Sequence, residues 1–237
     1  MCGVCVDSNS SSPTVTHVIP EGDEVTGVTS LGDDVFVVRY NSQQKIEVYD
    51  ANTFTLQRHI TVPGLGFSRF DLAVCPHNDC LYASDLHSAS VLRVDLSGSN
   101  ATRKRFMKRS GGNAVMKWSV TSGPVGLSVN SEHNLIVVSG ELKLQIFTTH
   151  GTLLQDIQLQ ADIEHPWHAV QLSTGQFLVS HGGSLHRVCL VAVDEAVVRS
   201  YGGQKGSQLT QHSTNRPGTV RTVHGTNSPG GYEQSTV

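Results

Sequence analysis

Cys80-Leu81-Tyr82-Ala83-Ser84-Asp85, followed after a short polar turn by Val91-Leu92-Arg93-Val94-Asp95, is the stretch of sequence that decides the fold. Both runs are short and rich in aliphatic and β-branched residues, which is typical of two neighbouring β-strands joined as a hairpin. An apolar run, Leu72-Ala73-Val74, precedes them, and a more polar run from Met116 to Val120 follows. The unit therefore predicts four consecutive antiparallel strands.

The same unit occurs four times along the chain, beginning near Gly27, Leu72, Gly126 and His168. The copies recur roughly every 42 to 55 residues, which is the range of propeller blades. In each copy the first strands are apolar and the last is polar, as expected when blades pack face to face around a channel. We therefore predict an all-β fold, a β-propeller of about four blades, each a four-stranded antiparallel sheet. A β-sandwich with regularly spaced strands is the alternative, but it would not require the same apolar-to-polar order four times.

Composition limits the other possibilities for this chain of 237 residues. No apolar run is long enough to span a bilayer, and Met1-Cys2-Gly3-Val4-Cys5 lacks the basic start of a signal peptide. We therefore expect a cytoplasmic protein with no membrane partner, and an odd total of five cysteines fits a reducing compartment. We divide the chain into a flexible N-terminus (residues 1–13), the propeller blades (14–203) and a disordered polar tail (204–237).

Three segments resemble the NHL-repeat propellers found at the C-terminus of tripartite-motif (TRIM-like) proteins. They are Cys80-Leu81-Tyr82-Ala83-Ser84-Asp85 with the strand after it, Leu144-Gln145-Ile146-Phe147-Thr148-Thr149-His150-Gly151, and Tyr201-Gly202-Gly203-Gln204-Lys205-Gly206-Ser207. The resemblance implies a ring that normally closes with six blades, whereas this chain supplies about four. We therefore expect an open or incomplete ring, with Thr14 to Ile19 as an orphan outer strand.

An incomplete ring has several possible explanations. The chain can be a truncated or divergent gene product, its four blades can close on themselves, or a partner chain can complete the ring. An open ring exposes blade faces and strand edges, so self-association is a further expectation.

Propellers commonly bind ligands at the mouth of the channel, where rigid blades hold the loops between blades and between the second and third strands. Aromatic and arginine side chains are frequent anchors in such interfaces. The candidate partner-binding residues in these loops are Tyr40, Phe67, Arg69, His87, Trp167, His168 and His181.

A second candidate surface is the long basic loop between the third and fourth strands of the second unit. Its cations can neutralise phosphates and its aromatic ring can stack on a base. The possible nucleic-acid-binding residues are Arg103, Lys104, Arg105, Phe106, Lys108 and Arg109. The net charge of −3 favours a solvated loop instead.

Catalytic and metal-binding motifs are absent from the sequence. Cys75 and Cys80 bracket a hairpin turn, so they are expected opposite each other, either as buried thiols, as a disulfide or as metal ligands with His77. Cys2 and Cys5 have no second pair of ligands at a zinc-site spacing. We expect no enzyme activity, no catalytic residue, no metal and no cofactor.

These observations predict a non-catalytic scaffold that binds a protein partner at one mouth of the propeller. The resemblance implies a substrate-recognition module of a ubiquitin-ligase-type system. The first alternative is single-stranded RNA binding on a basic face, which a basic mouth around Arg39 and Arg69 would favour. The second is a metal-dependent hydrolase or lactonase in the channel, which needs at least three converging ligands.

Overall fold

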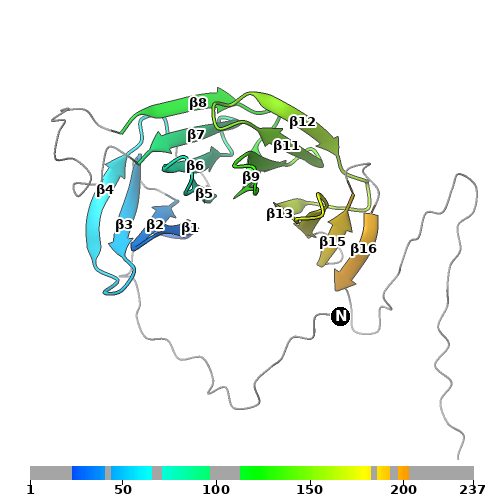
Figure 1. The fold of residues 1–237 in the computed structure, drawn as a ribbon, viewed down its shortest axis with the longest axis horizontal. Helices are drawn as coiled ribbons and strands as arrows, with labels where there is room; N and C mark the ends of the chain where they lie inside the picture. The colour runs from blue at the N-terminus through cyan, green and yellow to red at the C-terminus, as the bar shows by residue number, and fades with distance from the viewer. Residues whose placement is uncertain are drawn as a thin grey trace, which may run out of the picture. The chain divides into compact units, whose positions relative to one another are not determined.

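The computed structural model describes residues 23–40, 44–65, 71–96, 113–182, 186–192 and 197–202. Within these ranges the chain forms sixteen β-strands in four four-stranded antiparallel sheets, and it forms no helix (Figure 1). In the same ranges, therefore, no helix is available that could cross a membrane.

Each sheet consists of four strands that are consecutive in the chain, and neighbours in sequence are neighbours in the sheet. The first sheet is β1 (Val25–Leu31), β2 (Asp34–Arg39), β3 (Lys45–Asp50) and β4 (Leu56–Thr61). The second is β5 (Leu72–Cys75), β6 (Cys80–Asp85), β7 (Ser90–Asp95) and β8 (Val115–Ser119). The third is β9 (Pro124–Val129), β10 (Leu135–Ser139), β11 (Lys143–Phe147) and β12 (Leu153–Gln158). The fourth is β13 (Pro166–Gln171), β14 (Phe177–His181), β15 (Arg187–Val191) and β16 (Val197–Gly202).

The prediction of an all-β propeller with four four-stranded blades is confirmed by this topology. Residues 1–22 and 203–237 lie outside the described residues. The flexible N-terminus, the orphan strand and the disordered tail therefore stay predictions, as does the open ring.

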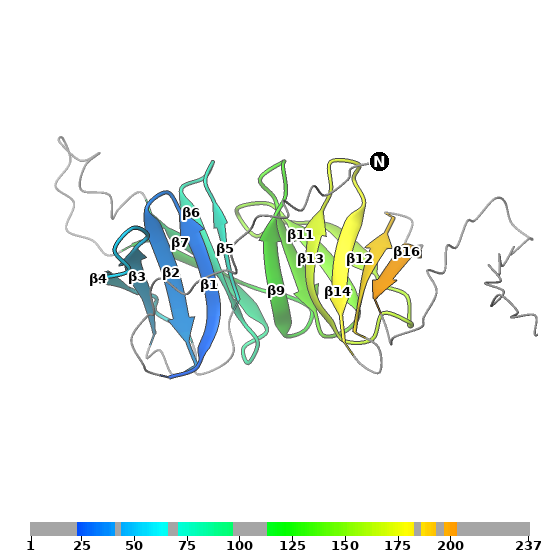
Figure 2. The ribbon, with the colours of Figure 1, turned by 90° about the horizontal axis from the view of Figure 1, so that it is seen from below.

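The chain forms two compact units, Met1–Leu127 and Ser128–Val237. The first two sheets belong to the first unit, and the fourth sheet and most of the third belong to the second, since the boundary runs through β9. In Figure 2 the strands of each sheet are seen running side by side.

Tight turns set the register of the hairpins. Leu31 pairs with Asp34 across a two-residue turn, where Gly32 has a φ of 59°, a left-handed conformation that glycine adopts without steric cost. At the same end of the sheet, where Asp50 pairs with Asp34, Asp50 Oδ1 accepts hydrogen bonds from the amides of Asn52 and Thr53 at 2.9 and 2.8 Å. These bonds favour the charged form and lower the pKa of Asp50.

The core of the first unit lies between its two sheets. Buried aliphatic and aromatic side chains from both sheets form one cluster that includes Phe36, Val48, Leu81 and Leu92. The two middle strands of each sheet carry most of this burial, whereas β1 is largely exposed. The expectation that the first strands would be the most buried is therefore wrong for β1, because no described sheet precedes it, whereas the edge strand β5 is buried against the first sheet.

Polar side chains link neighbouring sheets at equivalent points of the repeat. In the first unit, Asp71 Oδ2 accepts a hydrogen bond from the amide of Leu127 at 2.7 Å. In the second unit, Ser128 Oγ donates to the carbonyl oxygen of Ala169 at 2.6 Å. Leu127 and Ala169 occupy the same repeat position, three residues before Asn130 and Leu172, whose amides close the following hairpins. In the second unit, the first strand of the fourth sheet is therefore hydrogen-bonded through its backbone to the first strand of the third sheet.

We expect Asp71→Ala to lower the free energy of unfolding by about 1–3 kcal/mol, because the Leu127 amide would lose its partner in a partly buried position. Chemical denaturation measures this loss. The matched control is Asp156→Ala, which removes an exposed ion pair with Lys143 and should cost at most about 1 kcal/mol. Equal effects of the two substitutions would contradict a linking role for Asp71.

Candidate protein-binding rim

The predicted partner-binding residues that the structure describes lie at one end of their sheets. We call this end, where the first strand begins and the second strand ends, the rim. Backbone bonds hold it together: the amide of Tyr40 donates to Glu24 at 2.8 Å, and that of Gly182 donates to His165 at 3.0 Å. Phe67, Arg69 and the basic loop (Arg103, Lys104, Arg105, Phe106, Lys108 and Arg109) lie outside the described residues.

In the described part of the first unit, the rim exposes three large apolar side chains, those of Val25, Tyr40 and Leu86. The buried carboxylate of Asp85 shapes the loop that carries Leu86 and His87. Its Oδ1 accepts the amides of His87 and Ser88, both at 3.1 Å, and its Oδ2 accepts the Ser88 hydroxyl at 2.7 Å. Leu86 lies close to Gly123, where an added Cβ would stand 2.9 Å from the Leu86 carbonyl oxygen. The loop is therefore held on a fixed support.

The rim of the second unit exposes Trp167 and His168 at the start of β13. The indole packs against the backbone of Gly182, since a Cβ there would lie 2.7 Å from Trp167 Nε1. His181 differs from these two residues because it is buried, with Nε2 3.2 Å from Cys189 Sγ. Burial raises the pKa of the Cys189 thiol, so the thiol remains neutral near pH 7.

A polar residue ends the second strand of all four sheets, namely Arg39, Asp85, Ser139 and His181. Asp85, Ser139 and His181 are buried and Arg39 is mostly buried. Sequence reasoning named Arg39 and His181 but missed Asp85 and Ser139 as members of one set. An alignment of the four apolar second-strand runs would have revealed this set, because the last residue of each run is polar.

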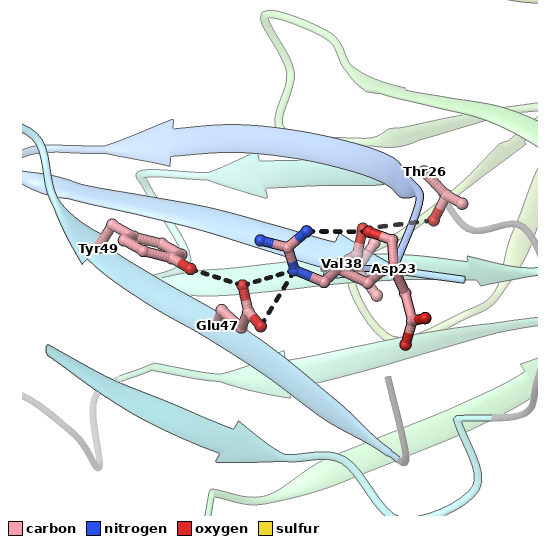
Figure 3. A network of polar contacts seen from close by, with 6 residues as sticks. Asp23, Thr26, Val38, Glu47 and Tyr49 are labelled. Atoms are coloured by element: carbon pink, nitrogen blue, oxygen red, sulfur yellow. Dashed lines mark hydrogen bonds and ion pairs between the residues drawn. The ribbon is translucent and has the colours of Figure 1, made fainter. Parts of the chain in front are cut away.

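Arg39 is hydrogen-bonded to Glu47, which Figure 3 labels together with Asp23 and Tyr49. Its Nε lies 3.2 and 3.1 Å from the two carboxylate oxygens of Glu47, and its Nη1 donates to the Asp23 carbonyl oxygen at 2.9 Å. The Tyr49 hydroxyl donates to Glu47 Oε2 at 2.8 Å. Burial, followed by the hydrogen bond to Glu47, raises the pKa of Tyr49.

The charge of Arg39 is thus matched by a carboxylate inside the same sheet. Its side chain is 12% exposed and that of Glu47 is 21% exposed. Asp23 and Glu24 beside it are exposed acids, and Lys45 at the start of β3 is an exposed base. The described rim of the first unit is therefore neutral to acidic, with apolar side chains at its surface.

Cys75 and Cys80 pair directly across the β5–β6 hairpin, as predicted, and both are buried free thiols. Asn78 Nδ2 donates to Cys75 Sγ at 3.2 Å. Burial raises the pKa of the Cys80 thiol. In the part of the chain that the structure describes, no three histidine, cysteine, aspartate or glutamate side chains converge as a metal site would require.

Comparisons with known proteins identify the fold. No family model and no curated protein matches the chain. Among solved structures, hydrazine synthase from Kuenenia stuttgartiensis is similar with a TM-score of 0.58 and 16% identity, over 86% of this chain and 54% of that one. Virginiamycin B lyase from Staphylococcus aureus is similar with a TM-score of 0.58 and 14% identity, over 76% of this chain and 56% of that one. U3-55K is similar with a TM-score of 0.60 and 12% identity, over 82% of this chain and 56% of that one.

At these identities the likeness shows the fold alone, a propeller-type arrangement of four-stranded sheets. The chain spans little more than half the length of the structures it matches, 54 to 56%. The resemblance to NHL repeats stays a prediction.

We expect Glu47→Ala to destabilise the protein by about 2–3 kcal/mol, because it leaves the mostly buried Arg39 without its carboxylate. Asp34→Ala is the control in the same sheet, since it breaks the more exposed pair with Arg58 and should cost about 0–1 kcal/mol. Urea denaturation of both variants checks the difference. A loss below 1 kcal/mol for Glu47→Ala would contradict the role of this pair.

The raised pKa of Tyr49 predicts a pH-dependent effect of Tyr49→Phe. Folding favours the neutral phenol, so the contribution of the hydroxyl is complete below the ordinary tyrosine pKa of about 10. It is lost as the pH rises through that value toward the folded pKa. Melting curves should show wild type more stable than Tyr49→Phe at pH 7, with the gap shrinking above pH 10. A gap that widens at alkaline pH would show that the sign is wrong.

Proposed function

We propose that this chain is a non-catalytic platform that binds a segment of another protein at the rim. The observation that carries the proposal is the pairing of Arg39 with Glu47, which neutralises one of the two arginines that would make the rim basic; the other, Arg69, lies outside the described residues. Among the described rim residues, the large apolar side chains that remain exposed are Val25, Tyr40 and Leu86 in the first unit and Trp167 in the second. Exposed aromatic side chains on a rigid support favour protein contacts, because little conformational entropy is lost on binding.

The chemistry of the rim also suggests the kind of segment that fits. An apolar anchor would pack on Tyr40 and Leu86, and a lysine or arginine beside it would meet the carboxylates of Asp23 and Glu24. We further propose, from the resemblance to tripartite-motif propellers, that the bound segment belongs to a substrate of a ubiquitin-ligase-type system. Single-stranded RNA is the competing ligand.

Site-specific photo-crosslinking in cells tests the proposal. A benzophenone amino acid replaces Tyr40, and the matched control replaces Leu56, which has the same exposure of 47% but lies at the opposite end of the first sheet. We expect discrete protein adducts at position 40 that survive nuclease, are absent at position 56, and disappear when excess wild-type chain competes.

Two results would contradict the proposal. Nuclease-sensitive adducts at position 40 would assign the rim to RNA. The same adducts at positions 40 and 56 would show that the rim has no binding role.

A further inference from the structure

The first and fourth sheets each have one partly exposed face, although the equivalent face of other sheets is buried against a neighbouring sheet. The four repeats share one position on their first strand. Val28, Leu72 and Ala169 each pair with the residue two before the end of the second strand, and Leu127 lies three residues before a hairpin-closing amide, as Ala169 does. The residue at this position is 4% exposed at Leu72, 2% at Leu127 and 1% at Ala169, but 60% exposed at Val28. Two of the three buried examples also make hydrogen bonds to another strand through their backbone: the Leu127 amide donates to Asp71, and the Ala169 carbonyl oxygen accepts from Ser128. Val28 is thus at the position where a preceding sheet would pack.

The complementary feature lies on the fourth sheet. In the first sheet, Phe36, Val48, Ile46 and Ile60 face the second sheet and are at most 4% exposed. The pairing registers place Leu178, Leu190, Val188 and Tyr201 at the same four positions of the fourth sheet. There Leu178, Val188 and Leu190 are only half-buried, and Tyr201 is 41% exposed. Among the described residues, the fourth sheet therefore repeats this apolar face with its side chains only partly covered.

We propose that a second copy of this chain provides the missing sheet, so that the fourth sheet of one copy packs on the first sheet of another. Leu190 and Tyr201 of one copy would bury Val28 of the other, as the first sheet already buries Leu72 of the second. A head-to-tail contact of this kind closes into a ring when the rotation permits. Two copies supply eight four-stranded sheets, twice the four of one chain and within the usual range of propellers.

The polar pair of Arg39 and Glu47, at the rim end of the first sheet, is compatible with this contact. Arg39 and Glu47 satisfy each other within one sheet. The corresponding pair of the fourth sheet, His181 and Cys189, is already buried. A polar pair at this position therefore does not prevent another sheet from packing over it. The inference concerns a different surface from the rim and does not rest on the proposed function.

The test uses the full chain and three variants, with the mass in solution followed by sedimentation velocity across a concentration series. Val28→Asp places a charge on the first sheet, at an exposed site where the fold should tolerate it. Leu190→Asp and Tyr201→Asp place one on the fourth sheet, and the exposed Tyr201 remains informative if Leu190→Asp fails to fold. We expect the wild type to have the mass of two chains and each variant the mass of one, with dimerisation weakened at least about tenfold.

Mixing the variants distinguishes a head-to-tail contact from other dimers. Val28→Asp retains an intact fourth sheet and Tyr201→Asp retains an intact first sheet. A mixture should therefore form a mixed dimer through the one remaining contact, although neither variant dimerises alone. Leu153→Asp, an equally polar change at a comparably exposed residue of β12 in the third sheet, should leave the wild-type dimer intact.

Three results would overturn the proposal. They are a monomeric wild type, a Val28→Asp variant that remains dimeric, and a mixture that stays monomeric.

Discussion

The middle strands of these sheets carry apolar side chains on both faces, and a single four-stranded sheet cannot bury both of them by itself. In the first unit, Phe36 and Val48 are covered only because Leu81 and Leu92 of the next sheet lie against them. Burying each such side chain contributes roughly 1.5–3 kcal/mol. Neither sheet has a core of its own, so the packing of one sheet on another holds the fold together. The conformation of the rim loops and the burial of the polar residues that end the second strands depend on that packing.

This dependence explains what could be predicted from the sequence. Strand and turn signals are local, so the runs around Leu81 and Val91, and their turns, were sufficient to predict four strands per unit. The pairing of Cys75 with Cys80 followed from the same hairpin, since the loop between them is short. Repetition then predicted the propeller, because the same order of strands four times has few other solutions.

The features that the sequence did not reveal depend on contacts between distant residues. The local sequence around His181 does not show that this residue is buried beside Cys189. The local sequence around Arg39 does not show that Glu47 neutralises its charge. Asp71 lies in a connecting segment, yet it bonds to an amide 56 positions further along the chain. Val28 resembles its repeat partners in sequence, and only the structure shows that it lacks the sheet that covers them. Function is predicted less well than fold for the same reason, because the rim combines loops from separate hairpins.

Hydrogen–deuterium exchange of the full chain tests most directly whether sheet-on-sheet packing holds the fold. If the first two sheets share their only core, amides in β2, β3, β6 and β7 should be the slowest to exchange in the first unit and should open with one common free energy. Amides in β1 and β4 should exchange sooner, since those edge strands are more exposed. Rapid exchange throughout β1–β4 while β5–β8 remained protected would show that the sheets are stable independently, and it would contradict this account.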